Sequence, residues 1–212
     1  MTALVLVLGL GVAAGGWIRG RDNGGHAAGA ASVSASPSYS MAAVTDACDL
    51  VDPKPLTKWS PNPKGPPTHE ETRPTTDDAG SLSCDVAYTS ATRGGYSFDT
   101  IAMSLEVEFT DGTAPPFYDH WKHLDTVTRA GPGTSTGAVT DLGAQGYWSS
   151  AIADSLTVQR AYVVCVQDGN VSVRVKIDLS RDDTRGPVAS WAELDSIARS
   201  QIRLALTGLK RK

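Results

Sequence analysis

The alternation of hydrophobic and polar residues predicts several strands in the second half of the chain and two before it. Apolar residues recur at every second position through residues 82–89 and 101–109, and again through 156–167 and 170–179. This period is typical of strands with one buried face. Because tight turns rather than helical crossovers join these segments, we expect them to pair in antiparallel fashion.

The clearest local pattern is a hairpin around Asp168-Gly169, a strong two-residue turn signal. The strand that follows is apolar at alternate positions from Val171 to Leu179. Pairing across the turn places four residues of the preceding strand on that same face: Val166, Val164, Tyr162 and Val158. Both strands therefore agree on which side is the core.

Two other segments have a helical period. After Pro115, four apolar residues are predicted to share one helix face: Phe117, Trp121, Leu124 and Val127. A second helix is expected over residues 187–206, where Ser190 and Glu193 have the spacing of a capping box. Its predicted buried stripe contains Trp191, Leu194, Ala198, Ile202 and Ala205.

Together these elements predict an α+β fold. A short helical entry at residues 47–51 and 56–59 comes first, and a polar, proline-rich loop at 60–81 leads to the strands. We expect an antiparallel sheet of about five strands with the two main helices packed on one face. This single domain is expected to span residues 46–212.

The N-terminal segment indicates membrane targeting. Residues 1–18 carry no charge, and Thr2 is their one polar side chain. A spanning helix needs about 20 such residues and a signal peptide about 7–15. We expect residues 1–18 to be a membrane anchor or uncleaved signal, and the Gly/Ala/Ser-rich residues 19–45 to be a flexible tether. The domain is then single-pass and extracytoplasmic, or secreted if the leader is cleaved.

Three cysteines allow three pairings. A Cys48–Cys84 disulfide would close the proline-rich loop and is the pairing we expect, while Cys84–Cys165 is the alternative. Loop closure of this length stabilises the fold by about 4 kcal/mol in the chain-entropy model. Cys165 is expected to be a small, half-buried apolar residue rather than a reactive thiol.

The distribution of charge and the lack of a complete metal-binding or catalytic motif argue against several classes of function. The net charge is −4 and no basic stripe is present, so we expect no nucleic-acid partner. His120 and His123 could meet one metal ion, but no third ligand accompanies them. His69, Glu70 and Glu71 are expected to be solvated loop residues. We therefore expect no metal, no cofactor and no catalytic residue.

Tyr147 and Trp148 are the candidate ligand-binding residues. They follow two glycines and would lie at the mouth of the sheet, where aromatic side chains could line a groove. Packing in the core is the alternative interpretation of both rings.

Several short motifs resemble a known family. They are the opening at residues 47–51, Cys84, the stretch 141–148, the Gly169-Asn170 hairpin and the amphipathic terminal helix. In these features residues 46–209 resemble the small secreted and lipoprotein domains of actinobacteria that form a domain family of unknown function. The chain is also similar in outline to the extracellular sensor domains of some of their receptor kinases.

The resemblance implies an export-side domain in which an early cysteine pairs with a second one downstream, and it implies no reaction. The chain differs from the family in having no lipidation cysteine after its apolar run and in carrying Cys165. We expect a non-enzymatic, membrane-tethered, sensor-like domain that binds a cell-wall fragment, lipid or small solute. An envelope accessory protein that docks another protein is the first alternative, and an enzyme is the second.

Overall fold

A computed structural model of the chain describes five stretches: residues 38–91, 98–112, 116–154, 157–181 and 189–210. The predicted anchor at residues 1–18 and most of the predicted tether lie outside them. Within these stretches, no helix is both long enough and apolar enough to cross a membrane.

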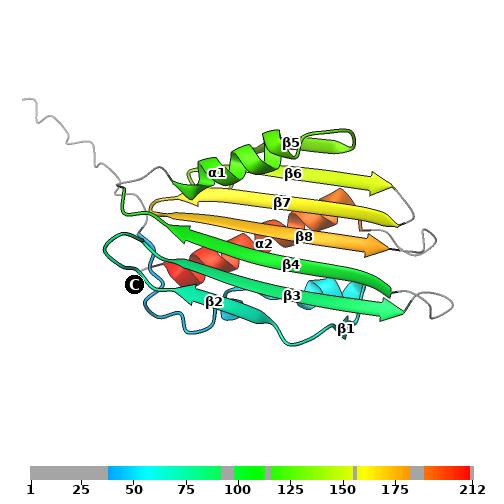
Figure 1. The fold of residues 1–212 in the computed structure, drawn as a ribbon, viewed down its shortest axis with the longest axis horizontal. Coiled ribbons are helices and arrows are strands. Elements are labelled where there is room, and N and C mark those ends of the chain that lie inside the picture. Colours follow the sequence, from blue (N-terminus) through cyan, green and yellow to red (C-terminus); the bar gives the residue numbers. More distant parts are fainter. Residues whose placement is uncertain (1–37, 92–97, 113–115, 155–156, 182–188, 211–212) are drawn as a thin grey trace, which may run out of the picture. The chain divides into compact units, whose positions relative to one another are not determined.

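In the described part of the chain, eight strands form one sheet in which all neighbours are antiparallel (Figure 1). The strands are β1 Asn62–Pro63, β2 Thr68–Thr72, β3 Ser81–Ala91, β4 Phe98–Phe109, β5 Thr134–Val139, β6 Gln145–Asp154, β7 Val158–Asp168 and β8 Val171–Arg181. Their order is β1-β3-β4-β8-β7-β6-β5, and β2 also pairs with β3. The prediction of about five strands is therefore wrong.

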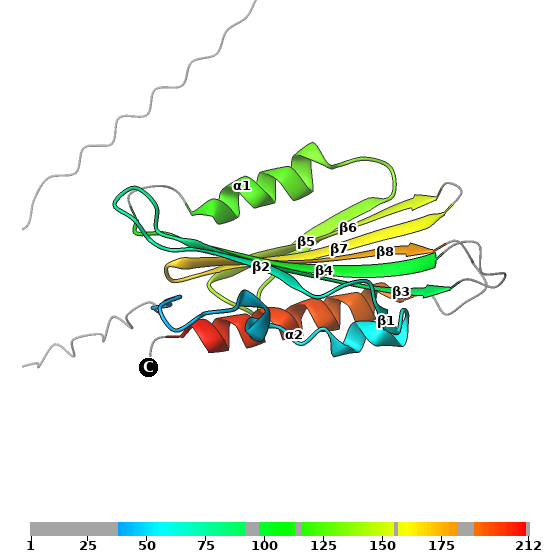
Figure 2. The ribbon, with the colours of Figure 1, turned by 60° about the horizontal axis from the view of Figure 1, so that its bottom comes forward.

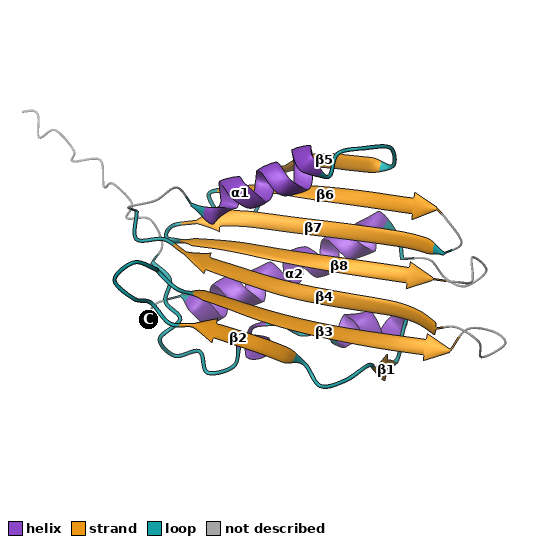
Figure 3. Ribbon diagram, viewed as in Figure 1, coloured by secondary structure: helices purple, strands orange, loops and turns teal. Residues whose placement is uncertain are grey.

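Three strands that the sequence did not predict, β1, β2 and β5, are short and polar, and they lie at the two edges of the sheet (Figure 3). In β2 every residue except Glu71 is exposed, and β5 buries only Val139 fully. Edge strands of this kind bury too few apolar side chains to leave a period-two pattern in the sequence. For this reason the stretch 60–81, which contains both β1 and β2, was predicted to be a loop.

The two main helices cover opposite faces of the sheet (Figure 2). Helix α1 comprises Phe117–His123 and continues as a π-helical turn over Leu124–Thr128, while α2 comprises Trp191–Leu209. The prediction that both helices pack on one face is wrong, because β7 presents apolar residues on both faces of the sheet. Val163 and Cys165 form a small core under α1, whereas Val164 and Val166 belong to the larger core under α2.

The β7–β8 hairpin confirms the predicted apolar faces but has a different register. Val166 pairs with Val173, and Asp168 pairs with Val171, so the turn residues are Gly169 and Asn170. Gly169 has a φ of 53°, which glycine adopts without steric cost. A shift of two residues leaves every side chain on its predicted face, because the alternation also has a period of two.

Helix α2 has nearly the buried stripe that its sequence predicts. Leu194, Ala198, Ile202 and Ala205 are buried, and Trp191 is half-buried. The predicted capping box is present: Glu193 N–H donates to Ser190 Oγ at 3.2 Å, and Ser190 N–H donates to the Glu193 carboxylate at 2.9 Å.

Helix α1 buries Trp121 as predicted, but the rest of its buried face differs from the prediction. Tyr118, Trp121 and Asp125 are its buried residues, while Phe117 is 42% exposed and Val127 is 59% exposed. An ionised aspartate is buried only where a partner compensates its charge. The partner of Asp125 is Arg174 of β8, in the sheet beneath the helix. The periodicity of the helix sequence does not reveal it.

The folded part begins before residue 46. Tyr39, Met41 and Val44 are buried in the larger core, and Tyr39 forms a β-bridge with Lys210. The predicted helical entry is present as two 3-10 helices, η1 at Ala47–Leu50 and η2 at Lys54–Lys58. The Cys48–Cys84 disulfide is confirmed, with its Cα atoms 5.1 Å apart.

Candidate functional site

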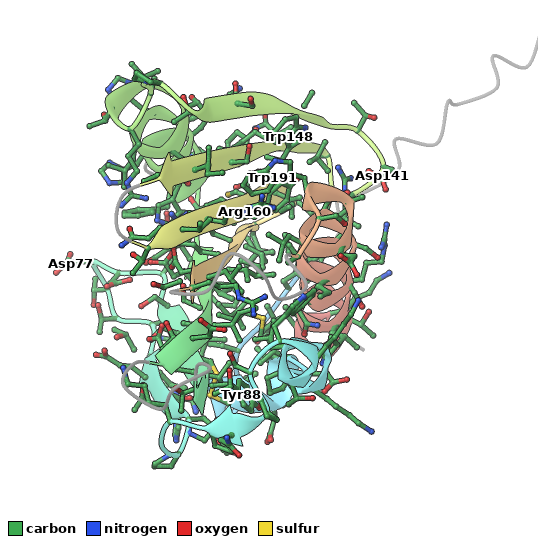
Figure 4. The ribbon with its side chains drawn as sticks, turned by 90° about the vertical axis from the view of Figure 1, so that its right-hand side faces the viewer. Asp77, Tyr88, Asp141, Trp148, Arg160 and Trp191 are labelled. Atoms are coloured by element: carbon green, nitrogen blue, oxygen red, sulfur yellow. A yellow bond between two sulfur atoms is a disulfide. The ribbon has the colours of Figure 1, made fainter. Side chains whose placement is uncertain are left out.

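An aromatic groove opens where the start of α2 meets β6 and β7. Trp148, Tyr162 and Trp191 line it, one from each element, and Figure 4 shows the two tryptophans on the α2 side of the sheet. The rings of Trp148 and Tyr162 are stacked with centroids 6.0 Å apart, and those of Tyr162 and Trp191 are 6.1 Å apart. The hollow measures about 380 Å³, which is at the small end of ligand sites.

The strand register brings the two sheet rings together. Ser150 of β6 lies opposite Tyr162 of β7, so Trp148 is the diagonal neighbour of Tyr162 on the same face. Gly137 of β5 lies opposite Trp148. A Cβ atom at residue 137 would lie 2.5 Å from Trp148 Nε1, so any larger residue would displace the indole ring.

The third ring is held by the beginning of α2 and by Arg160. Trp191 is the first residue of the helix, directly after the capping residue Ser190. The Arg160 guanidinium lies 5.1 Å from the centre of the Trp191 ring, and its Nη1 donates to Ala189 O at 2.7 Å. Arg160 Nε is the one buried side-chain polar atom of the described residues that lacks a hydrogen-bond partner.

A chain of charged groups forms the polar rim of the groove. Tyr162 Oη donates to Asp195 Oδ1 at 2.9 Å, and Arg199 Nε donates to both Asp195 oxygens at 2.8 Å. Arg199 and Arg203 in turn pair with Asp141. Burial and the hydrogen bond to Asp195 raise the pKa of Tyr162, which keeps its hydroxyl protonated and donating.

The structure does not bring the two predicted groove residues together. Tyr147 and Trp148 are neighbours in β6, so their side chains point to opposite faces. Trp148 lines the groove, whereas Tyr147 is 2% exposed in the core under α1. Tyr162 and Trp191 were predicted as core residues, and Tyr162 is buried in the larger core while Trp191 packs against it. Their periodicity does not show that the two rings also line a hollow.

Under α1, Tyr147 takes part in a buried ionic network. Its hydroxyl donates to Asp125 Oδ2 at 2.7 Å, and burial raises the pKa of Tyr147. Asp125 also accepts two hydrogen bonds from Arg174 and one from Arg129, each at 2.8 Å. These four donors fill the acceptor positions of one carboxylate, which supports a structural role for Asp125.

The remaining chemical candidates of the sequence lie apart. Cys165 is fully buried rather than half-buried, and burial raises the pKa of its thiol. His120 and His123 are exposed on α1, and the ring centroids of His120 and Phe117 are 4.9 Å apart. In the described part of the chain, no group of three possible metal ligands includes either histidine.

One cluster of possible metal ligands was missed in the sequence. Asp46, His69 and Glu71 each offer an atom within 4.8 Å of the others. His69 Nδ1 lies 3.0 Å from Glu71 Oε1, and this hydrogen bond raises the pKa of His69. In a strand, residues 69 and 71 lie on the same face. Because the stretch 60–81 was predicted to be a loop, their spacing did not indicate a shared site.

Two larger hollows lie where separate segments of the fold meet. One of about 930 Å³ lies beside residues 38–42, where Arg73 donates to the carbonyl oxygens of Met41 and Val44. The other, of about 590 Å³, lies between η2 and α2, beside the Lys58–Glu193 ion pair. The polar side chains named here are already engaged within the fold, and neither hollow has a set of rings comparable with the aromatic groove.

No family model matches the chain, and no curated protein or solved structure matches it either. The resemblance to the actinobacterial domains of unknown function therefore stays a prediction.

Proposed function

We propose that this chain is an extracytoplasmic, membrane-tethered binding domain whose ligand places a sugar ring of a cell-wall glycan in the aromatic groove. The observation that carries the proposal is the convergence of Trp148, Tyr162 and Trp191, from three separate elements, on one hollow of about 380 Å³. Residues from three elements that line one concave site are typical of small-molecule binding sites.

The chemistry of the groove favours a saturated ring with a polar edge. A pyranose presents an apolar face of C–H groups to an aromatic ring, and its hydroxyl groups need donors and acceptors at the periphery. Asp195 and Arg199 supply both kinds of group at the rim. Gly137 leaves the space that the Trp148 ring occupies, and Arg160 packs against the Trp191 ring. Rings already packed in this way lose little conformational entropy when a ligand binds.

The alternative of protein docking has less support. Among the described residues, three large hydrophobic side chains are exposed: Phe117, Val127 and Leu204. Phe117 and Val127 lie on α1, while Leu204 lies on α2, on the opposite face of the sheet. A docking surface usually presents a contiguous apolar patch instead.

Isothermal titration calorimetry with an N-acetylglucosamine tetramer tests the proposal. The wild-type chain should bind the tetramer saturably, and Trp148→Ala and Trp191→Ala should each weaken binding about tenfold, as expected for the loss of one stacking ring. Phe117→Ala is the matched control, since it removes an exposed ring on the other face and should leave the affinity unchanged. No saturable binding to the wild type, or equal binding by all variants, would contradict the proposal.

A further inference from the structure

Asp46, His69 and Glu71 meet near the disulfide, at the edge of the sheet opposite the aromatic groove. We propose that these three side chains bind one divalent transition-metal ion of the Zn²⁺ type. This site shares no residue with the groove, so the two proposals can fail independently.

The ligand set fits such an ion. One imidazole nitrogen and two carboxylate oxygens are ligands that Zn²⁺ accepts, with water completing the shell. Tetrahedral bonds of about 2.1 Å place ligand atoms about 3.4 Å apart. Glu71 Oε1 lies 3.0 Å from His69 Nδ1, whereas Asp46 Oδ2 lies 3.7 Å from His69 Nε2, the other ring nitrogen. One possible ligand atom from each residue nevertheless falls within 4.8 Å of the others. Because one ion takes a single imidazole nitrogen, binding requires the His69 ring to turn at this partly exposed surface.

Backbone amides orient both carboxylates. Asp46 Oδ1 accepts a hydrogen bond from Cys48 N–H at 2.7 Å, and Glu71 Oε1 accepts one from Ala47 N–H at 2.7 Å. The second oxygens also face His69: Asp46 Oδ2 lies 3.7 Å from Nε2, and Glu71 Oε2 lies 3.2 Å from Nδ1. Outer hydrogen bonds of this kind fix the orientation of metal ligands and raise metal affinity.

The disulfide holds the two segments that carry the ligands. His69 pairs with Cys84 in the β2–β3 ladder, and Cys84 is bonded to Cys48, two residues from Asp46. The ligands therefore sit close together before any ion binds. Three carboxylates surround His69, since Asp49 also acts on it electrostatically, and this local negative charge favours a dication.

Equilibrium dialysis of the full-length, oxidised chain against Zn²⁺, followed by elemental analysis, tests the site. After chelator treatment and dialysis against about 10 µM Zn²⁺, the wild type should retain about one equivalent and His69→Ala less than about a tenth of one. The matched control is His123→Ala, which removes an exposed histidine outside the cluster and should retain the full equivalent.

Two isosteric variants separate metal binding from structural roles. Asp46→Asn keeps an oxygen for Cys48 N–H, and Glu71→Gln keeps one for Ala47 N–H, so the metal-free proteins should melt at the wild-type temperature. Each should nevertheless bind Zn²⁺ at least tenfold more weakly. A wild type that retains no zinc has only ion pairs at this place, and zinc retained by His69→Ala belongs to other ligands; either result overturns the proposal.

Discussion

The Asp125 carboxylate and the Arg174 guanidinium form a two-pronged ion pair between α1 and the sheet. Arg174 Nε and Nη2 each lie 2.8 Å from one Asp125 oxygen, and the two side chains are 1% and 5% exposed. Glu106 of β4 pairs with the remaining side of Arg174. Since the two residues are 49 apart in sequence, this contact fixes α1 on its face of the sheet.

Loss of one partner of this pair should be strongly destabilising. Arg174→Met leaves the Asp125 charge buried with only Arg129 as a compensating cation, so we expect the free energy of unfolding to fall by about 3–5 kcal/mol. Urea unfolding measures the change. Lys176→Met is the matched control, because its partly exposed pair with Asp178 should contribute less than about 1 kcal/mol. Equal effects of the two variants would contradict a structural role for the buried pair.

The Cys48–Cys84 disulfide should stabilise the fold by constraining the unfolded chain. Its partners are 36 residues apart, and closure of such a loop contributes about 4 kcal/mol in the chain-entropy model. We therefore expect the Cys48→Ala/Cys84→Ala double variant to unfold at a correspondingly lower urea concentration.

A thiol count checks the pairing separately. The non-reduced protein should show no reactive thiol when folded and one, Cys165, after denaturation, because Cys165 is fully buried and burial raises the pKa of its thiol. Three thiols in the denatured, non-reduced protein would exclude the disulfide.

Glu108 should make the fold less stable as the pH rises. Burial, together with the nearby carboxylates of Asp78 and Glu106, raises the pKa of Glu108 to about 7 from its ordinary value of 4.5. Between these two pH values the folded state binds more protons than the unfolded state, so stability decreases as pH increases through this window.

Glu108→Gln removes this dependence. The gain in melting temperature over the wild type should therefore be larger at pH 8 than at pH 5, as measured by thermal unfolding at the two pH values. Glu70→Gln, on exposed β2, serves as the control and should show little difference at either pH. A gain that is the same at pH 5 and pH 8 would exclude a raised pKa at Glu108.

The sequence predicted best those elements whose apolar periodicity faces the larger core. These are β8, in which polar residues occupy the alternate positions, and the buried stripe of α2. The apolar face of β7 was predicted from its pairing with β8, although β7 is buried on both faces. The sequence did not predict β2 and β5, which are polar edge strands. It also did not predict the face of α1, because the position of Asp125 depends on Arg174, a partner in a distant strand.

The candidate site could be predicted only in part for the same physical reason. Trp148 was recognised from its local sequence, but Tyr162 and Trp191 lie in two other elements, and only strand pairing and the packing of α2 bring their rings beside it. Tyr147 was grouped with Trp148 because the residues are adjacent, although adjacent residues of a strand point to opposite faces. His69 and Asp46 meet only through strand pairing and the disulfide.

The most direct test of the aromatic groove is the response of the indole N–H signals to ligand in an NMR spectrum of the ¹⁵N-labelled protein. On addition of the N-acetylglucosamine tetramer, the signals of Trp148 and Trp191 should shift in a saturable way. Those of Trp59 and Trp121, which are buried elsewhere, should stay in place. Unchanged signals for Trp148 and Trp191, or shifts confined to Trp59 and Trp121, would contradict a ring-binding function for the groove.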